Sequence, residues 1–252
     1  MINLELPKFL RAGAAQAHQA AAEIFRPISR KYDLAEHEYP RELDTLASMM
    51  DGMADGGTAF SGATGGRGDG KKKERPGVKN GGNMASLLNV IETCWGDVGL
   101  TLSLPFQGLG NSALAAVATD EQLEAFGKTW SAMAITEPSF GSDSSAVTTT
   151  ARKDGDEYVL NGTKIFVTSG ERADSVVVWA TLDKSLGRAA IKSFLVKKGT
   201  PGFTVERLEE KLGIRASDTA TLRLEDVRVP KENLLGSPDI DVKKFFYVSL
   251  ST

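Results

Sequence analysis

The chain has 252 residues, of which 41% are hydrophobic and 25% are charged. This composition is typical of a soluble globular protein and leaves room for one large or two modest domains. The formal net charge of -3 is close to neutral, which argues against nucleic acid or an anionic membrane surface as the main partner.

The cysteine content and the start of the chain bear on the cellular compartment. Cys94 is the single cysteine, so an intramolecular disulfide is impossible, which fits a reducing environment. Residues 1–25 contain no continuous apolar stretch of the kind found in signal peptides. No apolar run approaches the length of a transmembrane helix. We therefore expect a cytoplasmic protein.

The first half of the chain shows helical periodicity. Apolar residues recur at helical spacing over residues 6–28, and a second predicted helix begins at Pro40. Residues 83–98 and a segment continuing to Val117 form two more predicted helices, and Thr119 with a glutamine three residues later predicts a capping box for a fifth. The sequence therefore predicts an all-α bundle over residues 1–129.

A glycine-rich insertion interrupts this bundle at residues 52–83. It also carries a basic cluster around Lys71 and Arg75. So much glycine disfavours regular structure, and long structureless loops are usually functional or disordered. Two interpretations stay open, a solvated flexible insertion and a basic lid over an anionic ligand.

After Trp130 the hydrophobic period changes from helical to that of strands. Asn161-Gly162 predicts a two-residue hairpin turn between two of these strands. Helices are lacking between the strands, which favours an antiparallel barrel or sandwich over a doubly wound sheet. The expected fold is α+β: an N-terminal all-α helical bundle over residues 1–129, an antiparallel β-barrel domain over 130–236, and the start of a further helix over 237–252.

Two segments of the second half place polar side chains where a ligand could bind. Residues 133–143 read MAITEPSFGSD, a short buried strand that ends in a turn rich in hydroxyls. Residues 163–168 alternate along a strand, so Lys164, Phe166 and Thr168 are expected on one face. An aromatic wall beside a hydroxyl suits a planar heterocycle. The alternative is ordinary turn chemistry, since such turns are common in β domains.

Four motifs occur together in an order typical of one family. They are Thr136-Glu137-Pro138 with Gly141-Ser142-Asp143, Asn161-Gly162-x-Lys164 leading to Phe166-x-Thr168, Arg215-x-Ser217-Asp218-Thr219, and Glu225-Asp226-Val227-x-Val229-Pro230. In this combination the chain resembles the acyl-CoA dehydrogenase family over residues 131–236. The resemblance before Trp130 is looser.

The resemblance implies FAD as cofactor and an acyl-CoA thioester as substrate, from which hydrogens are removed at the carbons α and β to the carbonyl. The cofactor contacts that it implies are Met133, Ile135, Thr136, Ser142, Phe166 and Thr168.

The resemblance implies a specific part in the site for five of these contacts. The backbone of Ile135 and Thr136, with the Thr136 hydroxyl, would meet the pyrimidine edge of the flavin. Ser142 would contact the pyrophosphate and bring its main chain near the acyl-CoA substrate, and Thr168 would lie near flavin N5. Phe166 stands where many relatives carry tryptophan, so it would cover a ring face without offering an indole N–H.

The sequence predicts no catalytic base and no metal site. The resemblance assigns no catalytic role to Glu137, and His18 and His37 have no metal-ligand partner nearby in the sequence. In the family, a C-terminal helical bundle supplies the catalytic carboxylate, and this sequence contains no such bundle. We therefore expect the chain as given to need a C-terminal domain or a partner chain.

The resemblance leaves alternatives open. The first expectation is an FAD-dependent acyl-CoA dehydrogenase that passes electrons to an electron-transfer flavoprotein and forms a homo- or hetero-oligomer. A flavin oxidase or monooxygenase of the same fold shares the same flavin contacts. A non-catalytic partner subunit of a heteromeric acyl-CoA dehydrogenase is the third possibility, because a truncated apolar helix face would need a partner.

Overall fold

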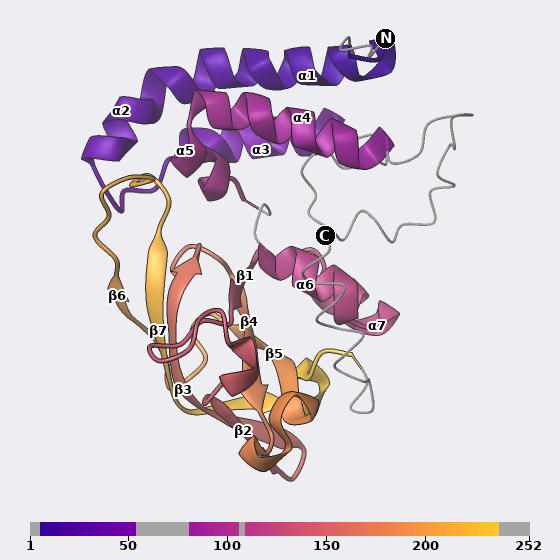
Figure 1. Cartoon of the computed structure of the whole chain (residues 1–252), viewed down its shortest axis with the longest axis vertical. Helices are drawn as coiled ribbons and strands as arrows, with labels where there is room; N and C mark the ends of the chain where they lie inside the picture. The colour runs from indigo at the N-terminus through magenta and orange to yellow at the C-terminus, as the bar shows by residue number, and fades with distance from the viewer. Residues whose placement is uncertain (1–5, 54–80, 106–108, 237–252) are drawn as a thin grey trace. The chain divides into compact units, whose positions relative to one another are not determined.

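The computed structural model describes residues 6–53, 81–105 and 109–236, drawn in colour in Figure 1. Most of the glycine-rich insertion and the predicted helix start over 237–252 lie outside these residues. The described residues separate into two compact units. Helices α1 to α5 and residues 211–217 make up the first unit, and helices α6 and α7 with the sheet make up the second.

The first unit is helical, as the sequence predicts. The long amphipathic segment at its start divides into two α-helices joined by a π-helical turn over Ala21–Phe25. The α-helices of this unit are α1 (Lys8–Ala20), α2 (Arg26–Leu34), α3 (Glu42–Met53), α4 (Gly81–Gly96) and α5 (Val98–Ser103).

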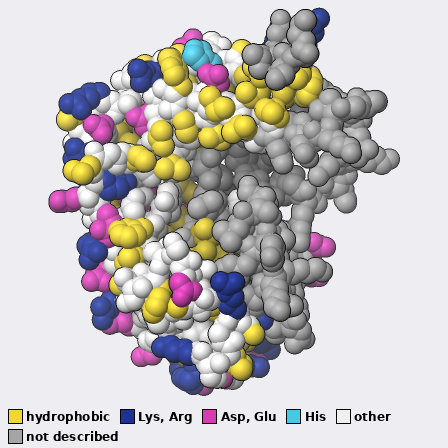
Figure 2. All heavy atoms as spheres, in the orientation of Figure 1, with side chains coloured by type: hydrophobic (Ala, Val, Ile, Leu, Met, Phe, Trp, Pro, Cys, Tyr) yellow, Lys and Arg dark blue, Asp and Glu magenta, His cyan; other side chains and the backbone are white. Residues whose placement is uncertain are grey.

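Helix α4 packs beside α1 and the π-helical turn (Figure 1). A Cβ atom at Gly96 would lie 2.8 Å from Ala21 Cβ and 3.0 Å from Phe25 Cβ, so only glycine permits this approach. The outer face of α4 is apolar, and hydrophobic side chains gather over this helical region in the space-filling view (Figure 2). The exposed apolar residues of α4 are Met84, Leu87, Val90, Ile91 and Trp95.

Residues 211–217 join the first unit although they come from the second half of the chain. Arg215 forms an ion pair with Glu36 at 2.7 Å, and the Lys211 N–H donates to the same carboxylate at 2.8 Å. These two donors hold the pKa of Glu36 below its ordinary value. Ser103 Oγ also donates to the Ala216 carbonyl at 3.0 Å. The segment is thus held to the helices by polar contacts.

The second unit is a seven-stranded sheet with two helices. The order along the sheet is β1-β4-β2-β3-β7-β6, and β5 pairs with β4. Its elements are α6 (Leu109–Val117), α7 (Asp120–Phe126), β1 (Ser131–Ala134), β2 (Thr150–Asp154), β3 (Glu157–Thr168), β4 (Ser175–Thr181), β5 (Ile191–Lys197), β6 (Phe203–Leu208) and β7 (Thr219–Pro230). The α+β class is therefore confirmed, whereas the predicted boundary at residue 130, which would separate α6 and α7 from the sheet, stays a prediction.

The expectation of a closed antiparallel barrel is wrong. Strands β1 and β4 pair in parallel, as do β2 and β4, so the sheet is mixed and curls into a half-barrel. A parallel pair requires a crossover connection, which is usually a helix. Here the connection from β1 to β4 runs through the hairpin of β2 and β3 instead, so the lack of helices did not exclude parallel pairing.

The predicted hairpin turn at Asn161-Gly162 is also wrong, because both residues lie inside β3. The turn that joins β2 to β3 is at Gly155, which has a φ of 63° and follows an aspartate. Asn161 instead pairs with Asp226 of β7 through two hydrogen bonds of 3.0 and 2.9 Å, where the β3·β7 register shifts. Gly162 is required for a different reason, since a Cβ there would lie 2.4 Å from Thr149 Oγ1.

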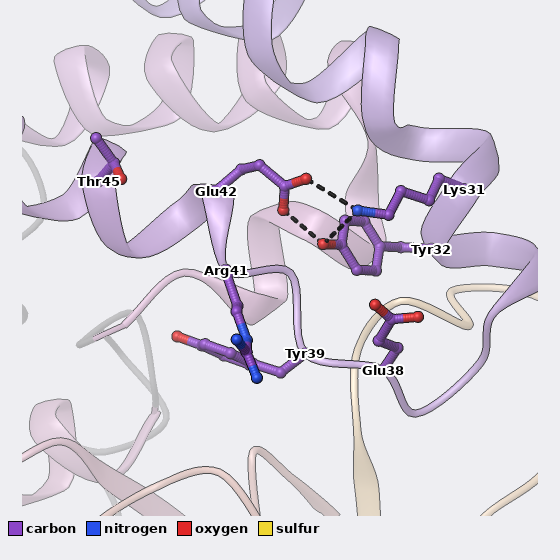
Figure 3. Close-up of a pocket in the computed structure, with 7 residues that line it drawn as sticks. All are labelled: Lys31, Tyr32, Glu38, Tyr39, Arg41, Glu42 and Thr45. Carbon is purple, nitrogen blue, oxygen red and sulfur yellow. Dashed lines mark hydrogen bonds and ion pairs between the residues drawn. The ribbon is translucent and has the colours of Figure 1, made fainter.

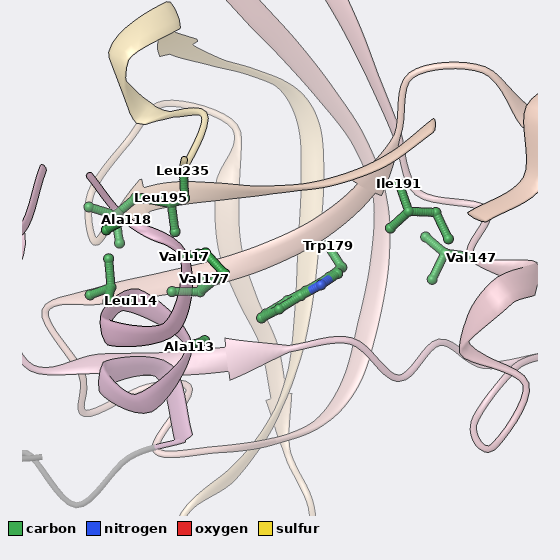
Figure 4. Close-up of a cluster of buried hydrophobic side chains, with 10 residues drawn as sticks. All are labelled: Ala113, Leu114, Val117, Ala118, Val147, Val177, Trp179, Ile191, Leu195 and Leu235. Atoms are coloured by element: carbon green, nitrogen blue, oxygen red, sulfur yellow. The ribbon is translucent and has the colours of Figure 1, made fainter. Parts of the chain in front are cut away.

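Helix α6 covers the sheet and completes its core (Figure 4). At its start a Cβ on Gly110 would lie 2.2 Å from the Ala132 carbonyl oxygen, so the helix lies against the β1 backbone. Asn111 donates to the Thr129 carbonyl at 2.8 Å and accepts from the Ser131 N–H at 2.9 Å. The buried cluster contains Ala113, Leu114, Val117, Ala118, Val147, Val177, Trp179, Ile191, Leu195 and Leu235.

The predicted capping box of α7 is confirmed. The Thr119 hydroxyl accepts from the Gln122 N–H, and the Gln122 side chain accepts from the Thr119 N–H. The Gln122 amide also donates to the carbonyls of Glu232 and Leu234 at 2.8 and 2.7 Å, which fixes the chain after β7. Among the described residues, no helix has the length and apolar character needed to cross a membrane.

Candidate functional site

The two predicted ligand-binding segments lie side by side. The turn after β1 contacts β3 through a backbone hydrogen bond of 2.9 Å from the Ile165 N–H to the Thr136 carbonyl. The turn itself closes through reciprocal backbone hydrogen bonds between Glu137 and Phe140 at 2.9 and 3.1 Å. Motifs separated by almost thirty positions in the sequence thus form one site in the sheet unit.

A β-bulge shapes the β3 side of this site. Lys164 pairs with Leu222 and Val167 pairs with Ala220, so three steps along β3 match two along β7. The expectation that Lys164, Phe166 and Thr168 share one face is therefore wrong, because the extra residue of a bulge interrupts the alternation. Lys164 is buried like Val167, whereas Phe166 is 60% exposed.

The backbone conformation at the bulge is unusual. Phe166 has a φ of 58°, a region that a bulky residue rarely adopts. Such conformations cost about 1–3 kcal/mol and cluster at ligand sites. The bulge thus leaves Phe166 60% exposed, two residues before the half-buried Thr168. An exposed aromatic ring can stack on a planar ligand.

The turn side of the site supplies further hydroxyls. Thr136 is half-buried, and a Cβ built on Gly141 would lie 4.0 Å from Thr136 Cγ2, so the turn folds back past this side chain. Ser142 follows Gly141 and is exposed. The other two predicted contacts, Met133 and Ile135, are partly buried against the hydrophobic cluster covered by α6. Their side chains therefore belong to the core.

A buried ion pair lies behind the turn, and sequence reasoning missed it. Lys164 Nζ is 2.8 Å from Glu137 Oε1, and the side chains are 0% and 2% exposed. Burial opposes ionisation of Glu137, but the Lys164 ammonium and the hydroxyls of Thr148 and Thr149 outweigh burial and lower the pKa of Glu137 to about 2. Burial lowers the pKa of Lys164, whereas the charge of Glu137 and its hydrogen bond favour the ammonium form. The pair is therefore ionised, and Glu137 serves as an acceptor rather than as a base.

A second buried carboxylate supports the turn that follows Thr168. Asp218 is fully buried, accepts from the Glu171 N–H at 3.0 Å and lies 3.4 Å from the Arg172 guanidinium. Its own carbonyl accepts from the Ser169 N–H at 3.2 Å. Two residues of the motif Arg215-x-Ser217-Asp218-Thr219 therefore have different roles. Arg215 binds within the helical unit, whereas Asp218 supports the sheet unit.

A separate pocket of about 520 Å³ lies in the first unit (Figure 3). Inside it Tyr32 donates to Glu42 at 2.5 Å, and Lys31 binds both residues at 3.0 Å. Its lining residues are Lys31, Tyr32, Glu38, Tyr39, Arg41, Glu42 and Thr45, none of which is a predicted cofactor contact. Over the described part of the chain, no cluster of histidine, cysteine or acidic residues could hold a metal ion.

Comparison with known proteins places these observations in a family. The family model described as "Acyl-CoA dehydrogenase, middle domain" matches residues 132–227, which contain all of the sheet-unit site. The chain is 52% identical over 110 residues to a mitochondrial short-chain specific acyl-CoA dehydrogenase of Rattus norvegicus, covering 44% of this chain and 27% of that protein.

Two bacterial relatives extend the similarity towards the N-terminus. The acryloyl-CoA reductase (NADH) of Anaerotignum propionicum is 36% identical over 228 residues, 87% of this chain and 54% of its own length. The solved butyryl-CoA dehydrogenase of Megasphaera elsdenii superimposes with a TM-score of 0.78 at 31% identity, over 97% of this chain and 62% of that one. The chain thus spans less than two thirds of the relatives that it matches.

Proposed function

The chain belongs to the acyl-CoA dehydrogenase family, and on this premise we propose that it forms the flavin-binding portion of an FAD-dependent acyl-CoA dehydrogenase. The observation that carries the proposal is the hydrogen bond from the Ile165 N–H to the Thr136 carbonyl, which joins the two predicted flavin-contacting segments. The exposed Phe166, two residues before Thr168, supplies an aromatic surface suited to an isoalloxazine ring.

Five of the predicted contact residues share the binding of FAD. The Thr136 hydroxyl and the backbone at Ile135 and Thr136 would hold the pyrimidine edge, Phe166 would cover a ring face, and the Thr168 hydroxyl would orient the edge where reduction occurs. The exposed Ser142 would bind the pyrophosphate. Bound FAD would supply the hydride acceptor for oxidation of an acyl-CoA thioester. Fixed hydrogen-bond donors at the ring would stabilise the charge that develops there, because preorganised donors do not have to reorient during the reaction.

The substrate and the partners follow from the same proposal. An acyl-CoA thioester would pass the main chain of Ser142, and a carboxylate from outside the described residues would remove the α proton. An electron-transfer flavoprotein would accept the electrons. In support, one of the solved structures that this chain resembles, at 30% identity and a TM-score of 0.77, is titled as an electron transferring flavoprotein of Acidaminococcus fermentans. An oligomer would complete the site.

The proposal is tested by adding FAD to the purified chain and recording the visible spectrum after gel filtration. We expect flavin to elute with the chain and to show a perturbed spectrum. Thr136→Val should raise the dissociation constant of FAD up to about tenfold, the effect of one hydrogen bond. Thr204→Val on the exposed face of β6 is the matched control and should leave the constant unchanged. A chain that elutes without flavin would contradict the proposal.

An oxidase of the same fold is the second candidate. A solved structure titled as the prolyl acyl carrier protein oxidase AnaB matches 98% of this chain at 25% identity and a TM-score of 0.74. The reaction of the reduced flavin with oxygen separates the two candidates, because a dehydrogenase should reoxidise slowly in air and an oxidase quickly.

A further inference from the structure

The buried pair of Lys164 and Glu137 lies directly behind the proposed flavin contacts and has no part in the function proposed so far. Lys164 Nζ makes two contacts with the turn, at 2.8 Å to Glu137 Oε1 and at 3.0 Å to the Ile135 carbonyl. Since both side chains are removed from solvent, neither contact is weakened by competing water. The Lys164 ammonium therefore binds the turn at two atoms, the Glu137 carboxylate oxygen and the Ile135 carbonyl oxygen.

Glu137 also accepts hydrogen bonds from a third segment of the sheet unit. Its Oε2 accepts from the N–H and hydroxyl of Thr148 at 2.7 and 2.5 Å. Its Oε1 accepts from the N–H and hydroxyl of Thr149 at 2.9 and 2.5 Å. The carboxylate is thus held by the two residues that precede β2 as well as by the lysine, so its position relative to Lys164 is fixed.

The energetics of such a pair favour a role in positioning. A buried ion pair often contributes little net stability, because the desolvation of two charges offsets their attraction, and hydrophobic replacements are frequently as stable. Charge-assisted hydrogen bonds are nevertheless short and strong, so they fix the atoms that they join. What the pair adds is the exact placement of the Ile135 carbonyl.

That placement has a geometric consequence on the other side of the turn. The peptide unit between Ile135 and Thr136 is planar and trans, so its carbonyl and its N–H point in opposite directions. Because Lys164 binds the Ile135 carbonyl, the Thr136 N–H must point away from the buried pair. The next carbonyl, that of Thr136, is held by the Ile165 N–H at 2.9 Å. Residues of β3 therefore bind the carbonyls of both Ile135 and Thr136. The Thr136 N–H, which lies between these two carbonyls, can point in only one direction.

We propose that Lys164 is a positioning residue, which through its ion pair with Glu137 aims the Thr136 N–H at the pyrimidine edge of the flavin. This inference rests on the proposed function. It explains why a lysine, rather than an apolar residue, fills a fully buried position in β3. It also assigns Glu137 the task of holding the lysine, with no contact of its own to the ligand.

The test compares two charge-neutralising double variants, each of which changes one residue of β3 and its partner on another segment. Lys164→Met/Glu137→Gln removes the buried pair and leaves no unpaired charge behind. Arg228→Gln/Glu157→Gln removes an exposed pair of similar length, 2.9 Å, at the far end of β3. For each full chain we would measure the dissociation constant of FAD, the visible spectrum at saturating FAD, and the thermal midpoint without FAD.

We expect the buried double variant to bind FAD at least tenfold more weakly than the exposed one. Its bound flavin should show a spectrum nearer to that of free FAD, a change that loss of stability alone does not cause. Equal affinity and an equal spectrum in the two double variants would overturn the positioning role while leaving the proposed function intact. If the unmodified chain binds no FAD, both the proposed function and this inference fail.

A milder variant decides the question if the buried double variant does not fold. Thr148→Val keeps both charges and removes one hydroxyl donor to Glu137 Oε2. It should raise the dissociation constant of FAD about threefold, part of the effect of one hydrogen bond. Unchanged FAD affinity in Thr148→Val would overturn the proposal, because weaker hydrogen bonding of Glu137 would then have no effect on the flavin contacts.

Discussion

Strand β3 contributes one residue to each of two ion pairs, which have nearly the same length and opposite surroundings. At one end Lys164 and Glu137 lie 2.8 Å apart with side chains 0% and 2% exposed. At the other end Arg228 and Glu157 lie 2.9 Å apart with side chains 51% and 45% exposed. Distance alone would rank the pairs as equal. Because the Lys164–Glu137 pair is buried, its geometry is fixed, whereas water and salt screen the exposed Arg228–Glu157 pair.

The largest expected effect comes from breaking the buried pair on one side. Lys164→Met leaves the Glu137 carboxylate buried without its counter-charge, which should lower the free energy of unfolding by about 3–5 kcal/mol. Urea unfolding followed by circular dichroism measures the change. Adding Glu137→Gln should recover a large part of it, since no uncompensated charge then remains. A double variant that is less stable than the single one would show that the cost lies in packing instead.

The second-largest effect is expected on acidification, which should reduce the contribution of the buried pair to the free energy of unfolding. The pKa of Glu137 is about 2 in the fold against 4.5 without its partners, so its contribution is fully present above pH 4.5 and is lost as the pH falls through 2. The shift corresponds to about 3 kcal/mol. Between pH 6 and pH 2 the unmodified chain should therefore lose about 3 kcal/mol more than Lys164→Met/Glu137→Gln does. Parallel stability curves for the two chains would contradict this assignment.

A substitution between the two ends tests how tightly the strand is packed there. Gly162→Ala would place a Cβ 2.4 Å from Thr149 Oγ1, at a residue that also binds Glu137. The overlap should lower the free energy of unfolding by about 1–3 kcal/mol. Gly213→Ala is the control, since a Cβ there meets nothing within 4 Å, and it should have little effect. Equal stability of the two variants would mean that Thr149 moves aside freely.

The smallest effect is expected at the exposed end. Arg228→Gln removes contacts with Glu157 and Asp154, both at 2.9 Å, yet it should change the free energy of unfolding by less than about 1 kcal/mol. The remaining difference should shrink as salt is added, because exposed charges are screened. A loss as large as that of Lys164→Met would remove the contrast between the two ends of the strand.

Local patterns in the sequence predicted local features well. The α+β class, the helices of the first half, the capping box of Thr119 and Gln122, and most strand positions depend on residues close together in the chain. The motif residues also predicted that Thr136 and Phe166 would belong to one site, although only through resemblance to a family. The fine contacts assigned to Met133, Ile135, Thr136, Ser142, Phe166 and Thr168 remain predictions about a ligand.

The errors arose where a distant partner strand decides the outcome. Asn161-Gly162 has the composition of a hairpin turn, but Asp226 and Thr149 hold it inside β3. Alternation predicted one face for Lys164 and Phe166, but the pairing with β7 inserts a bulge between them. The local signal for the true turn is Asp154 followed by Gly155.

The sequence by itself determined most of the helices and strands, because helical and strand periods are properties of neighbouring residues, and its motifs carried the resemblance to a family. Tertiary structure alone decided that β1 pairs in parallel with β4, that β3 bulges at Phe166, and that Lys164 reaches Glu137. Each of these depends on contacts between residues that lie far apart in the chain, which no local period encodes. The proposed aiming of the Thr136 amide belongs to this second group, since it follows from where three separate segments meet.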